Sequence, residues 1–136
     1  MTTRLLGLTT SLISAAGRNA RASLAARVAE RGLRLWHVAV LEALAGGSLS
    51  KGELAARLDI NPSDIVKVVD DLMAADCAVC TRSLRDRRRV EVSLTPAGES
   101  LLAELTAELV AVEDTVLAPL SCAEREQLAG LLERLA

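Results

Sequence analysis

The stretch that decides the fold runs from Ser50 to Pro96 and reads SKGELAARLDINPSDIVKVVDDLMAADCAVCTRSLRDRRRVEVSLTP. Ser50 followed by Glu53 is the pattern of a capping box, which predicts that a short helix begins there. Asn61 and Pro62 predict the start of a second helix, because asparagine caps helices well and proline is tolerated at the first helical position. Two short helices therefore meet across a tight turn.

The second of these helices has one apolar face, which is predicted to be buried. Its apolar stripe consists of Ile65, Val68, Val69 and Leu72. The residues that this stripe turns outward are Ser63, Asp64, Val66, Lys67, Asp70 and Asp71. Asp64 suits either a local cap that favours the helix dipole or an acceptor for a cytosine amino group.

The remainder of the stretch is predicted to be a β-hairpin with a charged tip. Past the second helix the apolar spacing changes to alternation, with Val90, Val92 and Leu94 on one side of a half-buried strand. The segment 78–83 is the expected partner strand. The tip between the strands reads LRDRRR, and five of the eight residues from 82 to 89 are arginine. This shape and charge suit a DNA groove better than an enzyme cleft.

Two helices are expected before this stretch. An amphipathic helix is predicted over 3–31 with Gly32 as its stop signal, and a compact apolar helix over 33–44. Trp36 and His37 carry the only aromatic rings in the sequence. Core packing for Trp36 and a hydrogen-bonded or solvent-facing role for His37 are the ordinary interpretations, and the alternative is that both line an effector cavity.

Two more helices are expected after the hairpin. Thr95 and Pro96 predict the start of a long helix with a near-heptad apolar seam, which ends at Pro119. Ser121 with Glu124 is a second capping box and begins a terminal amphipathic helix. The terminal helices would bury their apolar faces most economically against each other or against a second copy of the chain.

Composition favours a single, mainly α-helical domain. The chain has 136 residues, no Tyr or Phe and only three Pro. The formal net charge is −2, but the charge is uneven: acids outnumber arginines eight to two from Glu99 to the end, whereas the hairpin tip is basic. One histidine, no convergent acid pair and no glycine-rich phosphate loop argue against an enzyme, and no cofactor is expected.

The cysteines Cys77, Cys80 and Cys122 are odd in number, which indicates a reducing cytoplasm. Cys77 and Cys80 form C-x-x-C, yet no second ligand pair completes a zinc site, so no metal is expected. Structural burial is the ordinary interpretation, and a thiol sensor is the alternative. The first twenty residues only weakly imitate a signal peptide, and no window is apolar enough to span a bilayer.

The segments GELAARL, DINPSDIVKVVDDL, DRRRVEVSLTPAGESLL and LSCAEREQLAGLLERL resemble the MarR family of bacterial transcriptional regulators over essentially the whole chain. The run DRR, followed six residues later by LTPAG, is the most specific mark. The resemblance implies a winged helix-turn-helix fold, mainly α with a small β-hairpin wing, in one domain over 1–136. Dimerisation helices would occupy 1–32 and 97–136, and the DNA-binding region 33–96.

The resemblance also implies which residues meet DNA. Asp86 and Arg88 match the family's wing signature, in which the arginine enters the minor groove and the aspartate helps to orient the tip. The expected DNA-binding residues are Pro62, Ser63, Asp64, Val66 and Lys67 on the second helix, and Arg82, Arg85, Asp86, Arg87, Arg88 and Arg89 on the hairpin. Two positions depart from the family pattern: Asp76 stands where a glycine is common, and Cys80 where an arginine is common.

The function implied by the resemblance is that of a homodimeric, cytoplasmic repressor that binds a pseudo-palindromic operator in double-stranded DNA and is released by a small lipophilic or phenolic ligand. Trp36 and His37 are the expected ligand-binding residues. A thiol-redox-switched regulator of the same fold is one alternative. The other is a helical protein-interaction module with weakened DNA binding, because the acids Asp70, Asp71 and Asp76 lie near the DNA-facing helix and Cys80 replaces the arginine common in the family.

Overall fold

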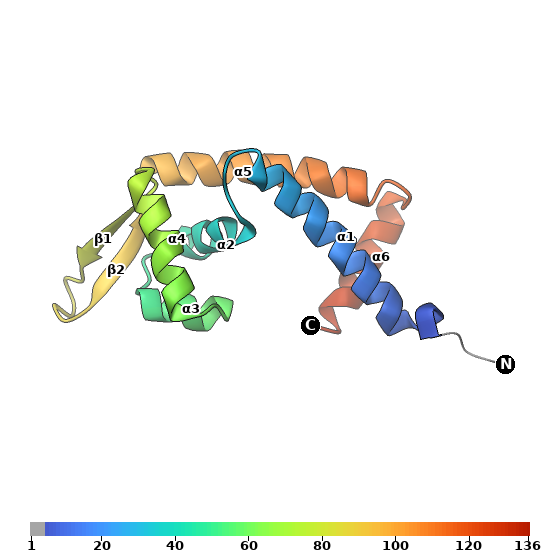
Figure 1. The fold of residues 1–136 in the computed structure, drawn as a ribbon, viewed down its shortest axis with the longest axis horizontal. Coiled ribbons are helices and arrows are strands. Elements are labelled where there is room, and N and C mark those ends of the chain that lie inside the picture. Colours follow the sequence, from blue (N-terminus) through green and yellow to red (C-terminus); the bar gives the residue numbers. More distant parts are fainter. Residues whose placement is uncertain (1–4) are drawn as a thin grey trace. The chain divides into compact units, whose positions relative to one another are not determined.

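The computed structural model describes residues 5–136, which form six α-helices, a short 3-10 helix and a two-stranded antiparallel sheet (Figure 1). The elements are η1 (Leu5–Gly7), α1 (Thr9–Ala29), α2 (Leu35–Ala45), α3 (Lys51–Leu58), α4 (Pro62–Ala74), β1 (Ala78–Arg82), β2 (Val90–Leu94), α5 (Pro96–Val116) and α6 (Cys122–Glu133). The predicted fold class, mainly α with a β-hairpin, is confirmed. The predicted start of the first helix at residue 3 lies outside the described residues, and α1 itself begins only at Thr9.

The chain divides into two compact units. One comprises Met1–Arg27 with Glu108–Ala136, and the other comprises Val28–Ala107. Both divisions fall inside helices, α1 and α5, whereas the boundaries expected from sequence fell at residues 32 and 97, close to helix ends. No helix within residues 5–136 combines the length and the apolar character that crossing a membrane requires.

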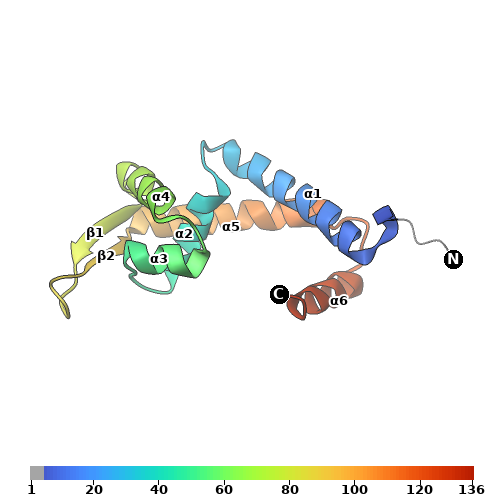
Figure 2. The same cartoon turned by 60° about the horizontal axis from the view of Figure 1, so that its bottom comes forward.

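The Val28–Ala107 unit packs α2, α3, α4 and the hairpin around one apolar core (Figures 1 and 2). Three of its helices supply buried side chains through one face each, as the spacing predicted. The fully or nearly fully buried residues include Val40, Leu41 and Leu44 of α2, Leu54 of α3, Ile65, Val68, Val69 and Leu72 of α4, and Val92 of β2. Burial of these side chains is the main term that stabilises the unit.

The helix starts form where the caps predicted them. The Ser50 hydroxyl accepts a hydrogen bond from the Glu53 backbone N–H at 3.1 Å, and the Glu53 carboxylate accepts one from the Ser50 N–H at 3.2 Å. Ser121 and Glu124 repeat this reciprocal arrangement at the start of α6. The Thr95 hydroxyl accepts from the Gly98 N–H at 3.1 Å and caps α5. These contacts satisfy backbone donors that a helix start otherwise leaves without partners.

A left-handed residue ends α4 and redirects the chain into the hairpin. Asp76 has a φ of +59°, and its N–H donates to the Met73 carbonyl, while the Cys77 N–H donates to the Leu72 carbonyl at 2.8 Å. This pair of bonds is a Schellman motif, in which the left-handed position favours glycine. The departure from the family pattern noted at Asp76 therefore falls at the one residue of this turn that needs a positive φ.

The LTPAG segment joins the hairpin to α5 through a close backbone approach. A Cβ atom placed on Gly98 would lie 2.0 Å from the carbonyl oxygen of Cys77. The same oxygen accepts a hydrogen bond from the Thr95 N–H at 3.1 Å. Glycine at position 98 therefore lets the first turn of α5 rest against the start of β1.

The hairpin is held to the helical core along its second strand. β1 and β2 pair antiparallel with Cys80 opposite Val92. Leu49, in the loop before α3, forms an isolated bridge with Val92 through two backbone hydrogen bonds of 2.7 and 3.1 Å. The backbone of Val92 on the edge of β2 away from β1 is thereby hydrogen-bonded, and this attaches the hairpin to the loop before α3.

The second unit consists of the described part of α1 up to Arg27, the later part of α5 and α6. Arg125 of α6 holds the turn after α5, because its guanidinium donates to the Leu117 and Leu120 carbonyls and to the Asp114 carboxylate at 2.9 Å. Many large apolar side chains of this unit remain exposed. They include Leu12, Ile13, Val110, Leu131, Leu132 and Leu135.

Candidate nucleic-acid interface

The exposed face of α4 is presented by a well-capped helix whose opposite face is anchored in the core. The Asn61 side chain accepts hydrogen bonds from the Ser63 N–H at 2.9 Å and from the Ser63 hydroxyl at 2.7 Å. The predicted outward residues Pro62, Ser63, Val66, Lys67 and Asp70 are all exposed. The buried stripe therefore turns these side chains away from the core and toward solvent.

Asp64 fits only part of its local interpretation. Its place in the first turn of α4 suits the helix dipole, and its side chain is half-buried. The reciprocal cap that the spacing from Asn61 also predicted is not formed, since the Asp64 carboxylate has no hydrogen-bond partner within residues 5–136. The Ser63 hydroxyl occupies the Asn61 side chain in its place.

The wing tip is ordered by two short side chains before any partner arrives. The Ser83 hydroxyl accepts from the backbone N–H groups of Arg85 and Asp86 at 3.2 and 3.3 Å. The Asp86 carboxylate accepts from the Arg88 N–H at 3.0 Å, and the Ser83 N–H donates to the Arg89 carbonyl at 2.8 Å, closing the loop. Asp86 thus orients the tip, as the resemblance implied for it, and Ser83 adds a contact that sequence reasoning missed.

The five hairpin arginines divide into two groups. Arg85, Arg87 and Arg88 are exposed, and their guanidinium groups have no partner in the described part of the chain. The Arg82 guanidinium donates to the Arg87 carbonyl at 2.8 Å and so stabilises the loop between β1 and β2. Arg89 is half-buried and pairs with two carboxylates. Three of the five are therefore available for an anion.

Arg89 connects the base of the wing to α3. Its guanidinium forms an ion pair with Glu53, the capping-box acid of α3, and a second with Glu91 of β2 at 3.2 Å. A single carboxylate, that of Glu53, therefore caps one helix and holds the hairpin. The sequence predicted a DNA contact for Arg89, whereas the structure places its charge in a structural pair.

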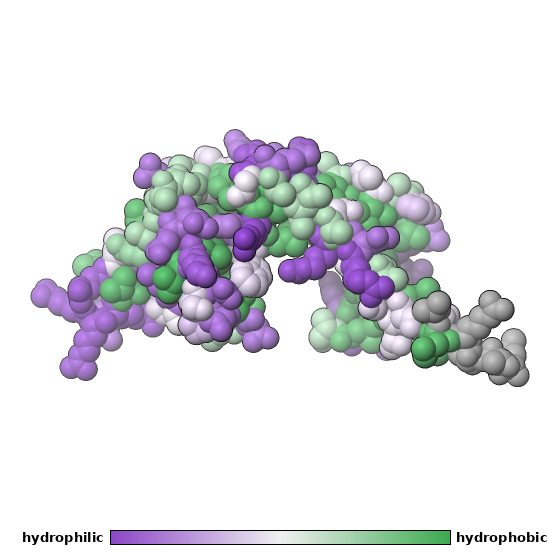
Figure 3. All heavy atoms as spheres, in the orientation of Figure 1, coloured by the Kyte–Doolittle hydropathy of each residue, from purple (hydrophilic) through white to green (hydrophobic). Residues whose placement is uncertain are grey.

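The surface charge differs between the wing tip and α4. The wing tip offers three unpaired cations, and α4 offers Lys67 but also the exposed Asp70. Figure 3 shows hydrophilic residues gathered over the wing tip, at the left end of that view. An anionic backbone is therefore attracted mainly by the wing, and α4 supplies a mixed polar and apolar face around Val66.

Comparison with known proteins decides the family. The sequence model of the MarR family matches residues 31–89, which contain α2, α3, α4 and the wing tip. A probable transcriptional regulator from Pseudomonas aeruginosa superposes with a TM-score of 0.83 at 30% identity, over 98% of this chain and all of that one. The chain belongs to the MarR family.

Two further relatives are similar to the chain. A putative transcriptional regulatory protein for the hcr operon of Thauera aromatica is 40% identical over 87 residues, which are 64% of this chain and 52% of that protein. A MarR family protein of Mycobacterium tuberculosis, solved in complex with salicylic acid, is 25% identical with a TM-score of 0.78 and 96% and 97% coverage. The chain spans between 52% and 58% of the length of the curated relatives it matches.

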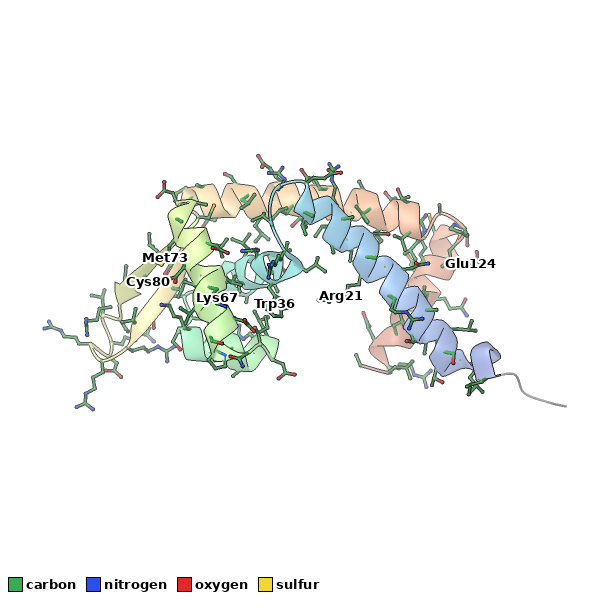
Figure 4. All side chains as sticks on the ribbon, viewed as in Figure 1. Arg21, Trp36, Lys67, Met73, Cys80 and Glu124 are labelled. Carbon is green, nitrogen blue, oxygen red and sulfur yellow. The ribbon has the colours of Figure 1, made fainter. Side chains whose placement is uncertain are left out.

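In this MarR-family chain both ring nitrogens of the buried His37 have partners. Nδ1 accepts from the Arg34 N–H at 2.9 Å, and Nε2 lies 2.9 Å from the Asp71 carboxylate. Trp36, labelled on α2 in Figure 4, is half-buried. Neither Trp36 nor His37 lines the groove of about 720 Å³ in this unit, whose walls include Glu42, Leu44, Ser93, Leu94, Glu99 and Leu102.

The three cysteines of this MarR-family chain have different surroundings. Cys77 is buried, as its structural interpretation predicted, and Cys122 is exposed. Cys80 is half-buried, with its Sγ 3.4 Å from the Met73 Sδ where β1 passes α4 (Figure 4). Across residues 5–136, no three His, Cys, Asp or Glu side chains gather in a way that could hold a metal ion.

Proposed function

We propose that this MarR-family chain is a homodimeric, sequence-specific DNA-binding repressor, acting in the cytoplasm and released from its operator by a small lipophilic or phenolic ligand. The observation that carries the proposal is the pre-ordered wing tip, which holds the unpaired guanidiniums of Arg85, Arg87 and Arg88 beside an exposed, capped helix. A winged helix-turn-helix uses such a helix in the major groove and such a tip in the adjacent minor groove.

The residues of α4 and Arg88 of the wing suit different parts of the DNA. Lys67 and the hydroxyl of Ser63 suit phosphates or base edges, and the methyl groups of Val66 suit a thymine methyl in the major groove. Asp64, with its unpaired carboxylate, suits the amino group of a cytosine. Arg88 suits the minor groove, because a narrow groove concentrates negative potential around a guanidinium. Pro62 sets the direction in which α4 enters the groove.

The remaining hairpin residues support these contacts. Arg85 and Arg87 suit the phosphates on either side of the minor groove. Asp86 holds the tip in shape, and Arg82 braces it through the Arg87 carbonyl. Arg89 acts in DNA binding by tying the wing to α3, since its charge is already paired with Glu53.

A homodimer would account for the uncovered apolar side chains of the second unit. Leu12, Val110 and Leu135 are 58%, 53% and 71% exposed, and water contact with such residues is unfavourable. A second copy offers the same faces and would bury them symmetrically. Two winged modules then match the two halves of a pseudo-palindromic operator.

The ligand part of the proposal draws on the salicylic acid bound by the Mycobacterium tuberculosis relative. In this chain we place such a ligand against Trp36, whose half-buried ring can stack with a phenol, with His37 next to it on α2. A ligand that favours a different spacing of the two recognition helices would shift the dimer away from operator-competent states.

Fluorescence anisotropy with the DNA upstream of the chain's own gene tests the proposal. Arg85, Arg87, Arg88 and Lys67 in two protomers give about eight phosphate contacts at most, so log K against log salt would slope at about −7. We expect sequence-selective binding that weakens roughly 10⁴-fold between 50 and 200 mM salt. Equal affinity for unrelated DNA, or an affinity indifferent to salt, would refute the proposal.

A thiol-switched regulator is the second candidate, and the contact between Cys80 and Met73 favours it. Peroxide would oxidise the Cys80 thiol to a sulfenic acid with release of water, adding a polar oxygen to a sulfur that now touches α4. Replacing Cys77, Cys80 and Cys122 singly by serine separates the two candidates. Peroxide-induced release that disappears only in Cys80→Ser supports the switch, and a response unchanged in all three variants excludes it.

A further inference from the structure

His37 joins α2 to the recognition helix α4 through a polar contact inside the unit Val28–Ala107. Its ring is only 5% exposed, and its Nε2 lies 2.9 Å from the Asp71 carboxylate. Asp71 belongs to the same helix as Ser63, Val66 and Lys67, the residues assigned to the DNA. His37 of α2 is therefore hydrogen-bonded to the helix that carries the proposed DNA-facing side chains.

The contact admits one tautomer of the ring. Nδ1 accepts the backbone N–H of Arg34 at 2.9 Å, so it carries no proton in this arrangement. The ring hydrogen then lies on Nε2 and is donated to Asp71. Both nitrogens are used, and the imidazole cannot rotate without losing two hydrogen bonds at once.

Asp71 differs from its neighbour Asp70 in having a partner. Both acids were expected to face outward and to weaken DNA binding, and both are exposed. The Asp70 carboxylate has no partner within residues 5–136, whereas that of Asp71 accepts the His37 bond. Within residues 5–136 no other side-chain hydrogen bond or ion pair joins α2 to α4, and both helices also bury apolar side chains, whose contacts have little directionality. The hydrogen bond is the directional element between the two helices.

We propose that His37 and Asp71 are positioning residues, which fix the rotation of α4 about its own axis and hence the direction of its DNA-facing side chains. This inference rests on the proposed DNA-binding function. Asp71 contributes to sequence discrimination through His37, and Asp70 contributes only its charge. The consequence is that two adjacent acids of one helix affect operator binding in opposite directions.

The test compares Asp71→Ala with Asp70→Ala, which remove the same charge and add the same helix-favouring residue. Both variants are measured by fluorescence anisotropy against operator DNA and unrelated DNA. We expect both to bind unrelated DNA slightly more tightly, because repulsion of phosphates is reduced. Asp71→Ala alone loses about tenfold in operator affinity, so only its specificity ratio falls. Equal ratios in the two variants would overturn the proposal.

Two substitutions of His37 separate positioning from simple helix capping. In His37→Gln the amide N–H₂ reaches toward Asp71 but the cap on Arg34 is lost, whereas His37→Asn keeps an oxygen near the Nδ1 position and loses Asp71. We expect His37→Gln to retain most of the specificity ratio and His37→Asn to lose it. If operator binding instead follows the thermal stability of the two variants, His37 serves only the fold of α2.

A measurement without DNA tests the contact independently of the proposed function. His37 is the only histidine in the chain, so its ring ¹⁵N signals need no assignment among histidines. We expect a protonated Nε2 and an unprotonated Nδ1, with an Nε2 proton that exchanges faster with water in Asp71→Ala. The opposite tautomer refutes the contact. The expected tautomer together with a wild-type chain that shows no operator binding refutes the DNA-binding function and, with it, the positioning role.

Discussion

Replacing Gly98 by alanine tests how closely the wing and α5 approach each other. The added Cβ would lie 2.0 Å from the Cys77 carbonyl oxygen and 3.0 Å from its carbon, and both are backbone atoms that cannot rotate away. The first turn of α5 has to move by about 1.4 Å to bring this Cβ to 3.4 Å, where ordinary van der Waals contacts begin, and this is overpacking of a filled core. That movement also strains the Thr95 N–H bond to the same oxygen.

The expected loss of stability is about 2 kcal/mol. Overpacking costs about 1–3 kcal/mol and the weakened hydrogen bond about 1 kcal/mol, while alanine gains about 1 kcal/mol over glycine in a helix. For a chain of this length the corresponding fall in Tm is about 6–10 °C. Circular dichroism during thermal and urea unfolding measures both quantities.

Gly52→Ala is the matched control for this experiment. Gly52 lies in α3 of the same unit, and the nearest atom to its added Cβ is the Ser50 hydroxyl oxygen at 3.9 Å, an ordinary contact. We expect this variant to be more stable by about 0.5–1 kcal/mol, because only helix propensity changes. A Gly98→Ala variant as stable as Gly52→Ala would contradict the close approach described for LTPAG.

Three further predictions follow from the geometry. Arg88→Ala weakens binding to all DNA sequences and reduces the salt slope by about 2, because the homodimer loses one contact in each protomer. Arg89→Ala leaves the slope near its wild-type value and lowers the unfolding free energy by up to about 1 kcal/mol, because Arg89 is paired with Glu53. Equal slopes in the two variants would contradict this difference between Arg88 and Arg89. Asp76→Gly raises the unfolding free energy by about 0.5 kcal/mol, because it relieves a positive φ of 59°, and a lower urea midpoint would refute the strain. The hydrogen bond from the Ser121 backbone N–H lowers the pKa of Glu124. The ionised Glu124 carboxylate therefore stabilises α6 fully above the unfolded-state pKa of about 4.3, and this stabilisation is lost as the pH falls through the lower folded-state pKa. Glu124→Gln is expected to lack this pH dependence when helicity is measured between pH 2 and 6, and a variant profile identical to that of the wild type would exclude this role of Glu124.

The local features of the fold could be predicted from sequence because their causes lie within a few residues. Ser50, Asn61, Thr95 and Ser121 cap helices where the spacing predicted, and each cap depends on side chains no more than three positions away. The apolar stripe of α4 is likewise a property of its own periodicity. Apolar spacing does not define helix ends as well as caps do: α1 begins at Thr9, after a 3-10 turn that the spacing does not indicate.

The features that could not be predicted join residues distant in the chain. The spacing of the hairpin arginines does not indicate that Arg89 is paired with Glu53, because the pair forms only once the wing packs on α3. His37 and Asp71 are 34 positions apart, and only the packing of α2 on α4 brings them together. These two contacts change the candidate site most, since they pair one of its arginines and one of its acids.

The finding at Asp71 also bears on the interaction-module alternative. That alternative depended on acids near the recognition helix, and the charge of Asp71 is directed to His37. Asp76 serves the turn after α4 with its backbone, and its carbonyl accepts the Thr95 hydroxyl. The carboxylates of Asp70 and Asp76 both lack a partner in the described chain, so only Asp71 of the three acids has its side chain paired.

DNA footprinting of the upstream region at physiological salt tests the central claim most directly, with wild-type protein and Arg88→Ala side by side. A dimeric winged helix-turn-helix predicts two protected major-groove patches about one helical turn apart, flanked by minor-groove protection that Arg88→Ala loses selectively. Uniform protection without preferred sites, or a pattern that Arg88→Ala leaves unchanged, would contradict a protein in which α4 binds the major groove and the wing binds the minor groove.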